Sequence, residues 1–246
     1  MMDWYPVFLR ELLIFRRRLL KFGYLLSAMM LPIIYFIVFG LGLGRMVQME
    51  GKSYLGFLIP GLVAMTSMTN SYTWIANSIN LNRLYFKTFQ VLYLAPISYS
   101  AIIIGEVLAG MLKGLFAASL IIVVGFLTYP NFGLSIPFLL ALLLNCFLFA
   151  SLGFLVGMSA KGHEETATYF NFFILPMGFF CGTFFPIERI PEFLKPVVFV
   201  LPLTYTNILI RKETFDTWSL GCVLVLVFYC VILFGLGFRV IKNYSE

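Results

Sequence analysis

The sequence predicts an all-α integral membrane protein, and its composition and its long apolar runs indicate this class. Of the 246 residues, 61% are hydrophobic and only 11% are charged, with a mean hydropathy of +0.96. Soluble domains carry about 25% charged residues, so this chain has too few charges to cover a water-facing globule. Its apolar runs approach or exceed the roughly 20 residues that a helix needs to cross a bilayer. The runs are continuous rather than alternating, which favours helices over the strands of a membrane barrel.

Six such runs predict six transmembrane helices within a single transmembrane domain, residues 1–246. An even number of spans places both termini on the same side of the membrane. If that side is the cytoplasm, ten Lys and Arg residues fall inside and six outside, as the positive-inside rule favours. We therefore expect a multi-pass protein with both termini cytoplasmic. The expected spans are residues 22–43, 54–76, 97–127, 136–158, 166–181 and 218–238.

Residues 1–21 predict an amphipathic helix that lies in the membrane interface. Apolar residues recur at helical spacing, while Arg10, Arg17 and Lys21 share another stripe of the helix. Such a helix buries its apolar face at the edge of the lipid tails and turns its basic face toward the headgroups. The alternative is that the basic run at residues 16–18 only orients the first span.

Two of the expected spans carry polar side chains that need partners inside a bilayer. The second span has a cluster of hydroxyl and amide residues around Asn70, which serves either helix packing or a substrate-lining face. The third span contains Glu106 and Lys113, which share one helix face about 10 Å apart along the axis. A lysine in mid-membrane costs on the order of 3 kcal/mol on insertion scales, so Lys113 should face protein or water. It lines a pathway, pairs with Glu106 or extends to the interface.

Residues 77–96 predict a short cytoplasmic helix between the second and third spans. The segment begins too polar to cross a membrane, and its apolar residues are interspersed with Arg83 and Lys87. Pro96 keeps the residue before it out of the helical region and so marks a boundary before the third span. A short rigid helix facing the cytoplasm can receive force from a soluble partner, and the alternative is an ordinary connecting loop.

Residues 182–203 predict a re-entrant gate on the outer side of the membrane. The fifth span is short, a glycine loosens the backbone at its end, and repeated prolines prevent one continuous helix. Irregular backbone is tolerated at membrane depth only where protein or a water-filled cavity covers it. We therefore expect two short helices that dip in from outside, either as a lid over a pathway or as an interfacial loop. The residues expected to form this gate are Gly182, Phe184, Phe185, Pro186 and Pro191.

No motif in the sequence predicts catalysis, a metal site or nucleotide binding. Gly51-Lys52-Ser53 ends like a phosphate-binding loop, but Met46 stands where that loop has its first glycine. The four cysteines form no close Cys-x-x-Cys pair, and His163 beside two glutamates offers too few ligands for a metal. The basic residues are scattered along the membrane edges, which argues against nucleic-acid binding. An intramembrane enzyme would have to use Glu106, His163 and Glu164.

Two stretches of the chain carry motifs of a known family. They are Ala95-Pro96-Ile97-Ser98 at the end of KTFQVLYLAPIS, and the spaced Gly182, Phe185, Pro186 and Pro191 followed by Pro202-Leu203-Thr204-Tyr205. Together with six spans and an interfacial N-terminal helix, these stretches resemble the type-2 ABC exporter permeases. That family includes permeases for drugs, nodulation factors, O-antigen polysaccharides and teichoic acids, and the likeness extends over nearly the whole chain. Gln90 departs from the pattern, because many members carry a glutamate there in their coupling helix.

The resemblance implies a half-transporter that hydrolyses nothing itself. Two copies would pair as a homodimer in the bacterial inner membrane, and two separate ABC ATPase subunits would dock on the cytoplasmic side. ATP and magnesium would bind to those subunits, so no cofactor is expected in this chain. Residues 81–94 would form the coupling helix, and closure of the ATPases would open the outer gate. The residues expected at the ATPase contact are Arg83, Tyr85, Phe86, Lys87 and Gln90.

The sequence therefore predicts the permease subunit of an ATP-driven exporter. Its aromatic-rich spans lack the several buried charges that a small-ion path would need, which favours an amphipathic or lipid-linked substrate. A glycolipid, a polysaccharide, a drug or a lipid fits this description. The alternative is an ATP-independent channel or uniporter, which would conduct without nucleotide.

Overall fold

The computed structural model describes residues 3–19, 30–43 and 53–244, and the regular structure in these ranges is entirely helical. Parts of two expected elements lie outside the described residues: both ends of the interfacial helix and residues 22–29 of the first span. The elements in chain order are α1 (Trp4–Leu19), η1 (Phe36–Leu43), α3 (Tyr54–Leu84), α4 (Thr88–Leu94), α5 (Tyr99–Thr128), α6 (Ile136–Ser159), α7 (His163–Tyr169), η2 (Phe170–Ile174), α8 (Leu175–Phe180), η3 (Ile187–Arg189), α9 (Lys195–Val200), α10 (Pro202–Leu209) and α11 (Thr217–Lys242).

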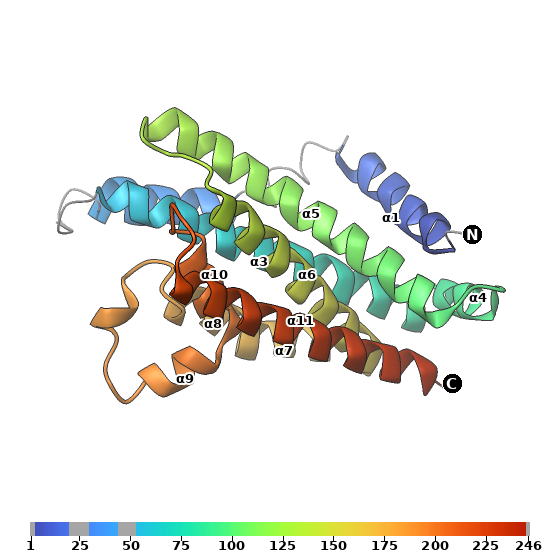
Figure 1. Ribbon diagram of the computed structural model, residues 1–246. Helices are drawn as coiled ribbons and strands as arrows, with labels where there is room; N and C mark the ends of the chain where they lie inside the picture. Colours follow the sequence, from blue (N-terminus) through green and yellow to red (C-terminus); the bar gives the residue numbers. More distant parts are fainter. Residues whose placement is uncertain (1–2, 20–29, 44–52, 245–246) are drawn as a thin grey trace.

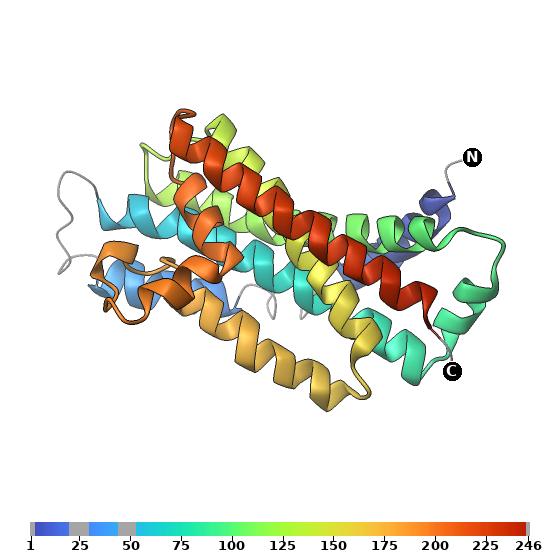
Figure 2. The same cartoon turned by 60° about the horizontal axis from the view of Figure 1, so that its bottom comes forward.

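Four long helices, α3, α5, α6 and α11, run side by side and form the body of the molecule (Figure 1). α3 contacts both α5 and α6, and α11 packs against α6. The two chain ends and α4 lie at one end of this bundle, which we call the terminal end, while α9 and α10 lie toward the other end (Figure 2). Termini at one end are what an even number of spans requires, and their orientation in the membrane stays a prediction.

A glycine allows α3 and α6 to approach closely. A Cβ atom on Gly153 of α6 would lie 2.6 Å from the carbonyl oxygen of Tyr72 in α3, which is closer than real Cβ contacts. Met68, Phe149 and Phe154 are fully buried and fill the core of the bundle. Small residues that bring helix backbones together are typical of helix packing in lipid, where burial of apolar surface drives little association.

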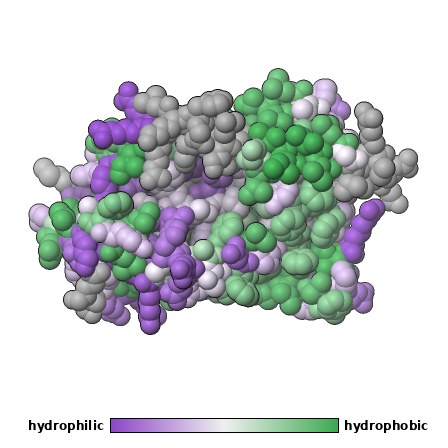
Figure 3. All heavy atoms as spheres, turned by 180° about the vertical axis from the view of Figure 1, so that it is seen from behind, coloured by the Kyte–Doolittle hydropathy of each residue, from purple (hydrophilic) through white to green (hydrophobic). Residues whose placement is uncertain are grey.

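Three described helices are long and apolar enough to cross a membrane: α5, α6 and α11. α3 has 31 residues, but its hydroxyl and amide side chains lower its hydropathy, and the helix Met30–Gly42 is apolar but shorter. On the face seen in Figure 3, hydrophobic residues gather over the half away from the chain ends, and hydrophilic residues gather toward the terminal end. The structure thus agrees with an all-helical membrane protein, while the count of six spans stays a prediction.

α1 packs lengthwise against α5. Its buried face consists of Val7, Glu11 and Phe15, which are spaced about one turn apart. This face differs from the apolar repeat on which the interfacial helix is predicted, because Tyr5 and Leu13 of that repeat are exposed. Arg10, which we expect from its stripe to face lipid headgroups, instead forms an ion pair with Glu106 of α5 at 2.7 Å.

The segment between α3 and α5 differs from the single helix expected over residues 81–94. α3 continues without a break to Leu84, and the separate seven-residue helix α4 starts only at Thr88. Between them, Lys87 adopts a left-handed backbone conformation with φ of +54°. A residue with a side chain pays roughly 1–2 kcal/mol for this conformation, so the surrounding contacts must hold the turn.

The expected fifth span consists of three successive segments, α7, η2 and α8, of which η2 is a five-residue π-helical stretch. After α8 the chain forms the short turn η3 and then two short helices, α9 and α10, rather than one rod. Pro196 and Pro202 stand in the first turns of α9 and α10, where a helix does not need the missing N–H. Of these two helices only α9 lies wholly within residues 182–203, because α10 continues to Leu209, and the gate and its depth in the membrane stay predictions.

Candidate functional site

A cavity of about 420 Å³, which we call the membrane pocket, lies between α3, the helix Met30–Gly42 and the α7–α8 segment. One wall is a stripe of hydroxyl and amide side chains on α3 that includes Thr66 and Asn70. The facing walls are apolar and aromatic, with Tyr35 and Phe170 among them. None of the described residues that line the pocket is charged.

The polar wall of the membrane pocket can form hydrogen bonds with a ligand. The Asn70 amide donates to the carbonyl oxygen of Thr66 at 2.9 Å, and the Thr69 hydroxyl donates to the carbonyl of Met65 at 3.0 Å. These bonds use donors within α3, whereas amide and hydroxyl oxygens have lone pairs that can accept. The pocket therefore suits a molecule with uncharged polar groups beside apolar ones. Asn70, for which the sequence leaves packing and pathway open, lies in the pocket wall.

Next to this wall, a buried cluster of charged side chains, which we call the charge cluster, joins α1 to α5. Lys113 Nζ lies 2.8 Å from Glu11 Oε2, and Arg10 Nη2 lies 2.7 Å from Glu106 Oε1. Trp74 of α3 donates its indole N–H to Glu11 at 3.1 Å, and the Lys113 ammonium lies 3.8 Å from the centre of the Trp74 ring. Removing one partner of such a buried pair leaves an uncompensated charge, so we expect the loss of either Glu11 or Lys113 alone to be strongly destabilising.

The charge cluster pairs Lys113 differently from the partner that the sequence offers. Lys113 pairs with Glu11 of α1, whereas Glu106 of α5 pairs with Arg10. Neither Lys113 nor Glu106 lines the membrane pocket. The sequence analysis did not identify Glu11 as a functional candidate. The signal that could have identified it is its position one turn after Val7, on the same face of α1.

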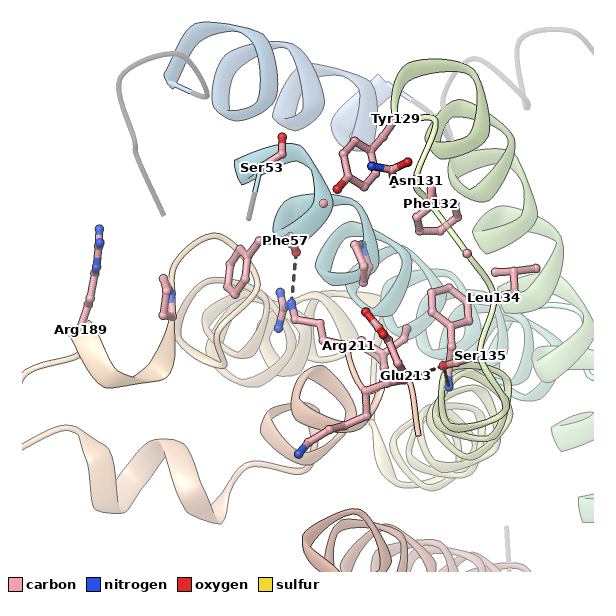
Figure 4. A pocket seen from close by; sticks show the side chains of 17 residues that line it. Ser53, Phe57, Tyr129, Asn131, Phe132, Leu134, Ser135, Arg189, Arg211 and Glu213 are labelled. Atoms are coloured by element: carbon pink, nitrogen blue, oxygen red, sulfur yellow. Dashed lines mark hydrogen bonds between the residues drawn. The ribbon is translucent and has the colours of Figure 1, made fainter. Parts of the chain in front are cut away.

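At the end of the bundle away from the chain ends, Arg211 holds the turn that follows α8. Its guanidinium donates to the carbonyl oxygens of Gly182 at 2.8 Å, Asn207 at 2.9 Å and Phe57 at 3.1 Å, and lies 3.9 Å from the centre of the Phe57 ring. Figure 4 shows Arg211 pointing toward Phe57 of α3. Burial lowers the pKa of Arg211 to about 9, which leaves the side chain charged at pH 7. We call these contacts the Arg211 clasp.

The expected gate residues Gly182 and Phe184 lie inside this turn. Gly182 has φ of +81°, and a Cβ there would also lie 2.7 Å from Ile187 Cγ1, so the turn requires glycine. Phe184 is 3% exposed, and its ring centre lies 4.5 Å from that of Phe39 in η1. The Tyr54 hydroxyl of α3 donates to the carbonyl of Phe184 at 2.8 Å. The turn is therefore packed against η1 and α3.

The other expected gate residues lie at the surface of the same segment. Phe185 and Pro191 are exposed, while Pro186 is half-buried and lines a cavity of about 980 Å³ at this end of the bundle. Lys212, which also lines this cavity, donates to Asp216 at 2.6 Å. That bond, with further bonds from Ser219, holds the pKa of the Asp216 carboxyl well below its usual range.

At the terminal end, the residues expected at an ATPase contact divide into exposed and buried groups. Tyr85 and Phe86 are 66% and 67% exposed, and Lys87 is exposed beside them. Arg83 is buried instead, and its guanidinium donates to the carbonyl of Ala160. Arg83 therefore ties α3 to the loop before α7.

α4 adds an apolar surface to this end that sequence reasoning missed. Phe89 is 1% exposed and anchors α4, and Gln90 beside it is half-buried. Val91 and Leu94 are 73% and 82% exposed. Clustered exposed apolar side chains indicate a contact surface. In a helix of only one or two turns, the spacing of apolar residues repeats too few times to show which face is exposed and which is buried.

Comparison with known proteins decides the family. Residues 7–215 match the family described as "ABC-2 type transporter". The chain belongs to the ABC-2 type transporter family. The matched range begins in α1 and includes the membrane pocket, α4 and the Arg211 clasp, and it ends before α11.

Relatives of the chain include other ABC-2 permeases. It is 31% identical over 174 residues to the inner membrane transport permease YadH of Escherichia coli strain K12, covering 70% of this chain and 68% of YadH. It is 27% identical over 205 residues to nodulation protein J of Sinorhizobium fredii, covering 81% of this chain and 77% of that protein. Nodulation protein J of Bradyrhizobium diazoefficiens is 28% identical over 218 residues, with coverage of 85% and 80%.

These matches confirm the resemblance to the type-2 ABC permeases. A membrane subunit of this family is a transport permease and not itself an enzyme, and family membership implies pairing with an ABC ATPase subunit. The name of YadH places that relative in the inner membrane, and the apolar helices of this chain agree with a membrane location.

Proposed function

We propose that this ABC-2 permease is the membrane-spanning half of an ATP-driven exporter for an amphipathic or lipid-linked substrate. The membrane pocket is the observation that carries this proposal. Its α3 wall offers hydroxyl and amide groups, while its other walls are apolar, and no lining residue in the described part of the chain is charged. A substrate with uncharged polar groups next to a greasy part satisfies both kinds of wall.

The position of the membrane pocket supports assembly as a homodimer. No residue of α5 or α6 lines it, so the pocket lies on the side of α3 that these helices leave uncovered. A second copy facing this side would enclose a pathway between the two chains. Two ABC ATPase subunits, which would bind ATP and magnesium, would then dock at the terminal ends on the cytoplasmic side.

The exposed terminal surface supports a route for force from the ATPases. Tyr85, Phe86 and Lys87 with α4 would receive the motion of the ATPase, and Gln90 would lie at the edge of this contact. α4 leads directly into α5, and the charge cluster fixes α1 to α5. Trp74 of α3 also binds Glu11, so motion at α4 would reach α5, α1 and α3, and the gate at residues 182–203 would open at the far end.

An ATPase assay in proteoliposomes tests the substrate pocket. The permease and the ABC ATPase encoded with it would be reconstituted together and exposed to lipid-linked oligosaccharides and amphipathic drugs. We expect one class to stimulate ATP hydrolysis, and the variant Asn70→Leu to lose that stimulation while keeping basal hydrolysis. Asn131→Leu is the matched control, because Asn131 is exposed in the turn before α6, outside both the pocket and the expected ATPase contact. Stimulation that survives Asn70→Leu would contradict the pathway, and ion conduction without nucleotide would favour a channel.

A further inference from the structure

A second cavity of about 420 Å³ lies on the other side of the α7–α8 segment, and we call it the apolar pocket. It is lined by side chains of α3, α6, α7–α8 and α11, and it shares no lining residue with the membrane pocket. Phe170 and Leu175 line the membrane pocket, whereas Ile174 and Met177, next to them in sequence, line the apolar pocket. The α7–α8 segment, which runs along one edge of the bundle in Figure 2, therefore separates two different cavities.

The lining of the apolar pocket is almost entirely hydrocarbon. Leu148 and Leu152 of α6 and Leu233 of α11 form much of its wall, and none of its described lining residues is charged. Polar groups enter only as the hydroxyls of three tyrosines and one serine and as backbone. α6 and α11 are two of the helices apolar enough to span a membrane, so the molecules that reach this cavity come from the bilayer.

Tyr72 gives the apolar pocket a hydrogen-bond donor without a protein partner. The side chain is 2% exposed, and within the described part of the chain its hydroxyl oxygen has no hydrogen-bond partner. Tyr229, which lines the same pocket, is different, because its hydroxyl donates to the carbonyl of Val200 at 2.6 Å. A buried hydroxyl that lacks a partner is costly, so Tyr72 favours an occupant that brings an acceptor oxygen.

We propose that the apolar pocket binds an uncharged lipid of the bilayer whose ester carbonyl accepts a hydrogen bond from Tyr72. The cavity is within the size range of small-molecule sites, and a mostly hydrocarbon wall with the buried, unpartnered hydroxyl of Tyr72 fits a diacylglycerol-like molecule. A free fatty acid is disfavoured, because none of the described residues that line the pocket carries a positive charge to pair with its carboxylate. This site is separate from the transport pathway and does not depend on the proposed function.

Binding of 1,2-dioctanoylglycerol to the purified full chain tests the site. The apparent Kd would be measured by native mass spectrometry from a non-ionic detergent. Tyr72→Phe keeps the ring and removes only the donor, so we expect about five-fold weaker binding, as the loss of one neutral hydrogen bond implies. Leu152→Trp fills the cavity, and we expect it to abolish binding. Tyr35→Phe removes a hydroxyl from the membrane pocket instead, and we expect no change.

Three results would overturn this proposal. Equal affinity of wild type and Tyr72→Phe would remove the role of the hydroxyl. Weaker binding to Tyr35→Phe with unchanged binding to Tyr72→Phe would place the lipid in the membrane pocket. Octanoate that binds as tightly as dioctanoylglycerol would show that the site does not select uncharged molecules. If Leu152→Trp does not fold, the near-isosteric pair Tyr72→Phe and Tyr35→Phe still decides the question.

Discussion

At the scale of single residues, two buried cations are bound by different kinds of partner. Lys113 is paired with a carboxylate, Glu11, and so fixes α1 to α5 in the middle of the bundle. Arg211 is held by backbone carbonyl oxygens instead, and so fixes the turn after α8 to α3 and α10. Each cation joins segments that lie far apart in the sequence, so the loss of either should loosen one joint rather than the whole fold.

The Glu11–Lys113 pair should show strong coupling in a double-mutant cycle. Lys113→Met leaves the Glu11 carboxylate buried without its main partner, so we expect a loss of about 3–5 kcal/mol in the free energy of unfolding. The double variant Glu11→Gln/Lys113→Met removes both charges and should recover most of that loss. Thermal unfolding in detergent of the wild type, the two single variants and the double variant measures the coupling. Purely additive losses would show that the pair does not hold α1 in place.

At the scale of elements, the gate segment after α8 is a packed structure held by a few specific contacts. Arg211 donates to the carbonyl of Gly182, and the Tyr54 hydroxyl donates to the carbonyl of Phe184. The positive φ of Gly182 makes the turn possible. α9 and α10 follow as short helices that begin with prolines. A segment held by such a small set of bonds can be released when neighbouring helices move.

Weakening the clasp should open the gate segment without unfolding the bundle. Arg211→Gln loses several charge-assisted hydrogen bonds, each worth about 1.5–3 kcal/mol, so we expect the opened population to rise at least about tenfold. The buried Cys181, directly before the turn, reports this opening as faster reaction with a maleimide. The background would carry alanine at Cys146, Cys222 and Cys230. The control is Arg189→Gln, because Arg189 is an exposed arginine that lines the cavity of about 980 Å³ beside Arg211. We expect it to leave the rate of maleimide labelling unchanged.

At the scale of the whole molecule, the terminal end and the segment expected to form the gate lie at opposite ends of one bundle (Figure 1). α4 precedes α5 in the chain, and the charge cluster links α5 to α1 and, through Trp74, to α3, which carries both the pocket wall and a contact to the turn after α8. We therefore expect a displacement of α4 to pass to α3 as well, and so to act on the pocket and the gate together.

The two basic residues at the terminal end should respond differently to charge reversal. Lys87 is exposed, so Lys87→Glu should keep the fold and uncouple ATP hydrolysis from transport. Arg83 is buried and binds the carbonyl of Ala160, so Arg83→Glu should also lower thermal stability. Unfolding curves and ATPase assays with the partner subunit distinguish the two effects. Normal coupling in Lys87→Glu would argue against an ATPase contact at this turn.

Local patterns in the sequence predict much of this architecture. Long apolar runs predict the helices of the bundle, and the prolines after Gly182 predict short helices in place of one rod. The specific joints are long-range contacts, and no local pattern reports them. Glu11 meets Lys113 across 102 positions of the chain, and Arg211 meets Phe57 across 154. The positive φ at Lys87 likewise could not be predicted from the sequence, because lysine, unlike glycine or asparagine, is not typical of such turns.

The most direct test of the account is the ATP dependence of Cys181 labelling from the outside. The permease with Cys181 as its single cysteine would be reconstituted with its ABC ATPase and treated with a membrane-impermeant maleimide. For a gate driven by the ATPase, we expect slow labelling without nucleotide, several-fold faster labelling during ATP hydrolysis, and no acceleration with a catalytically inactive ATPase. Labelling that is equally fast with and without ATP would contradict a gate driven from the cytoplasmic side.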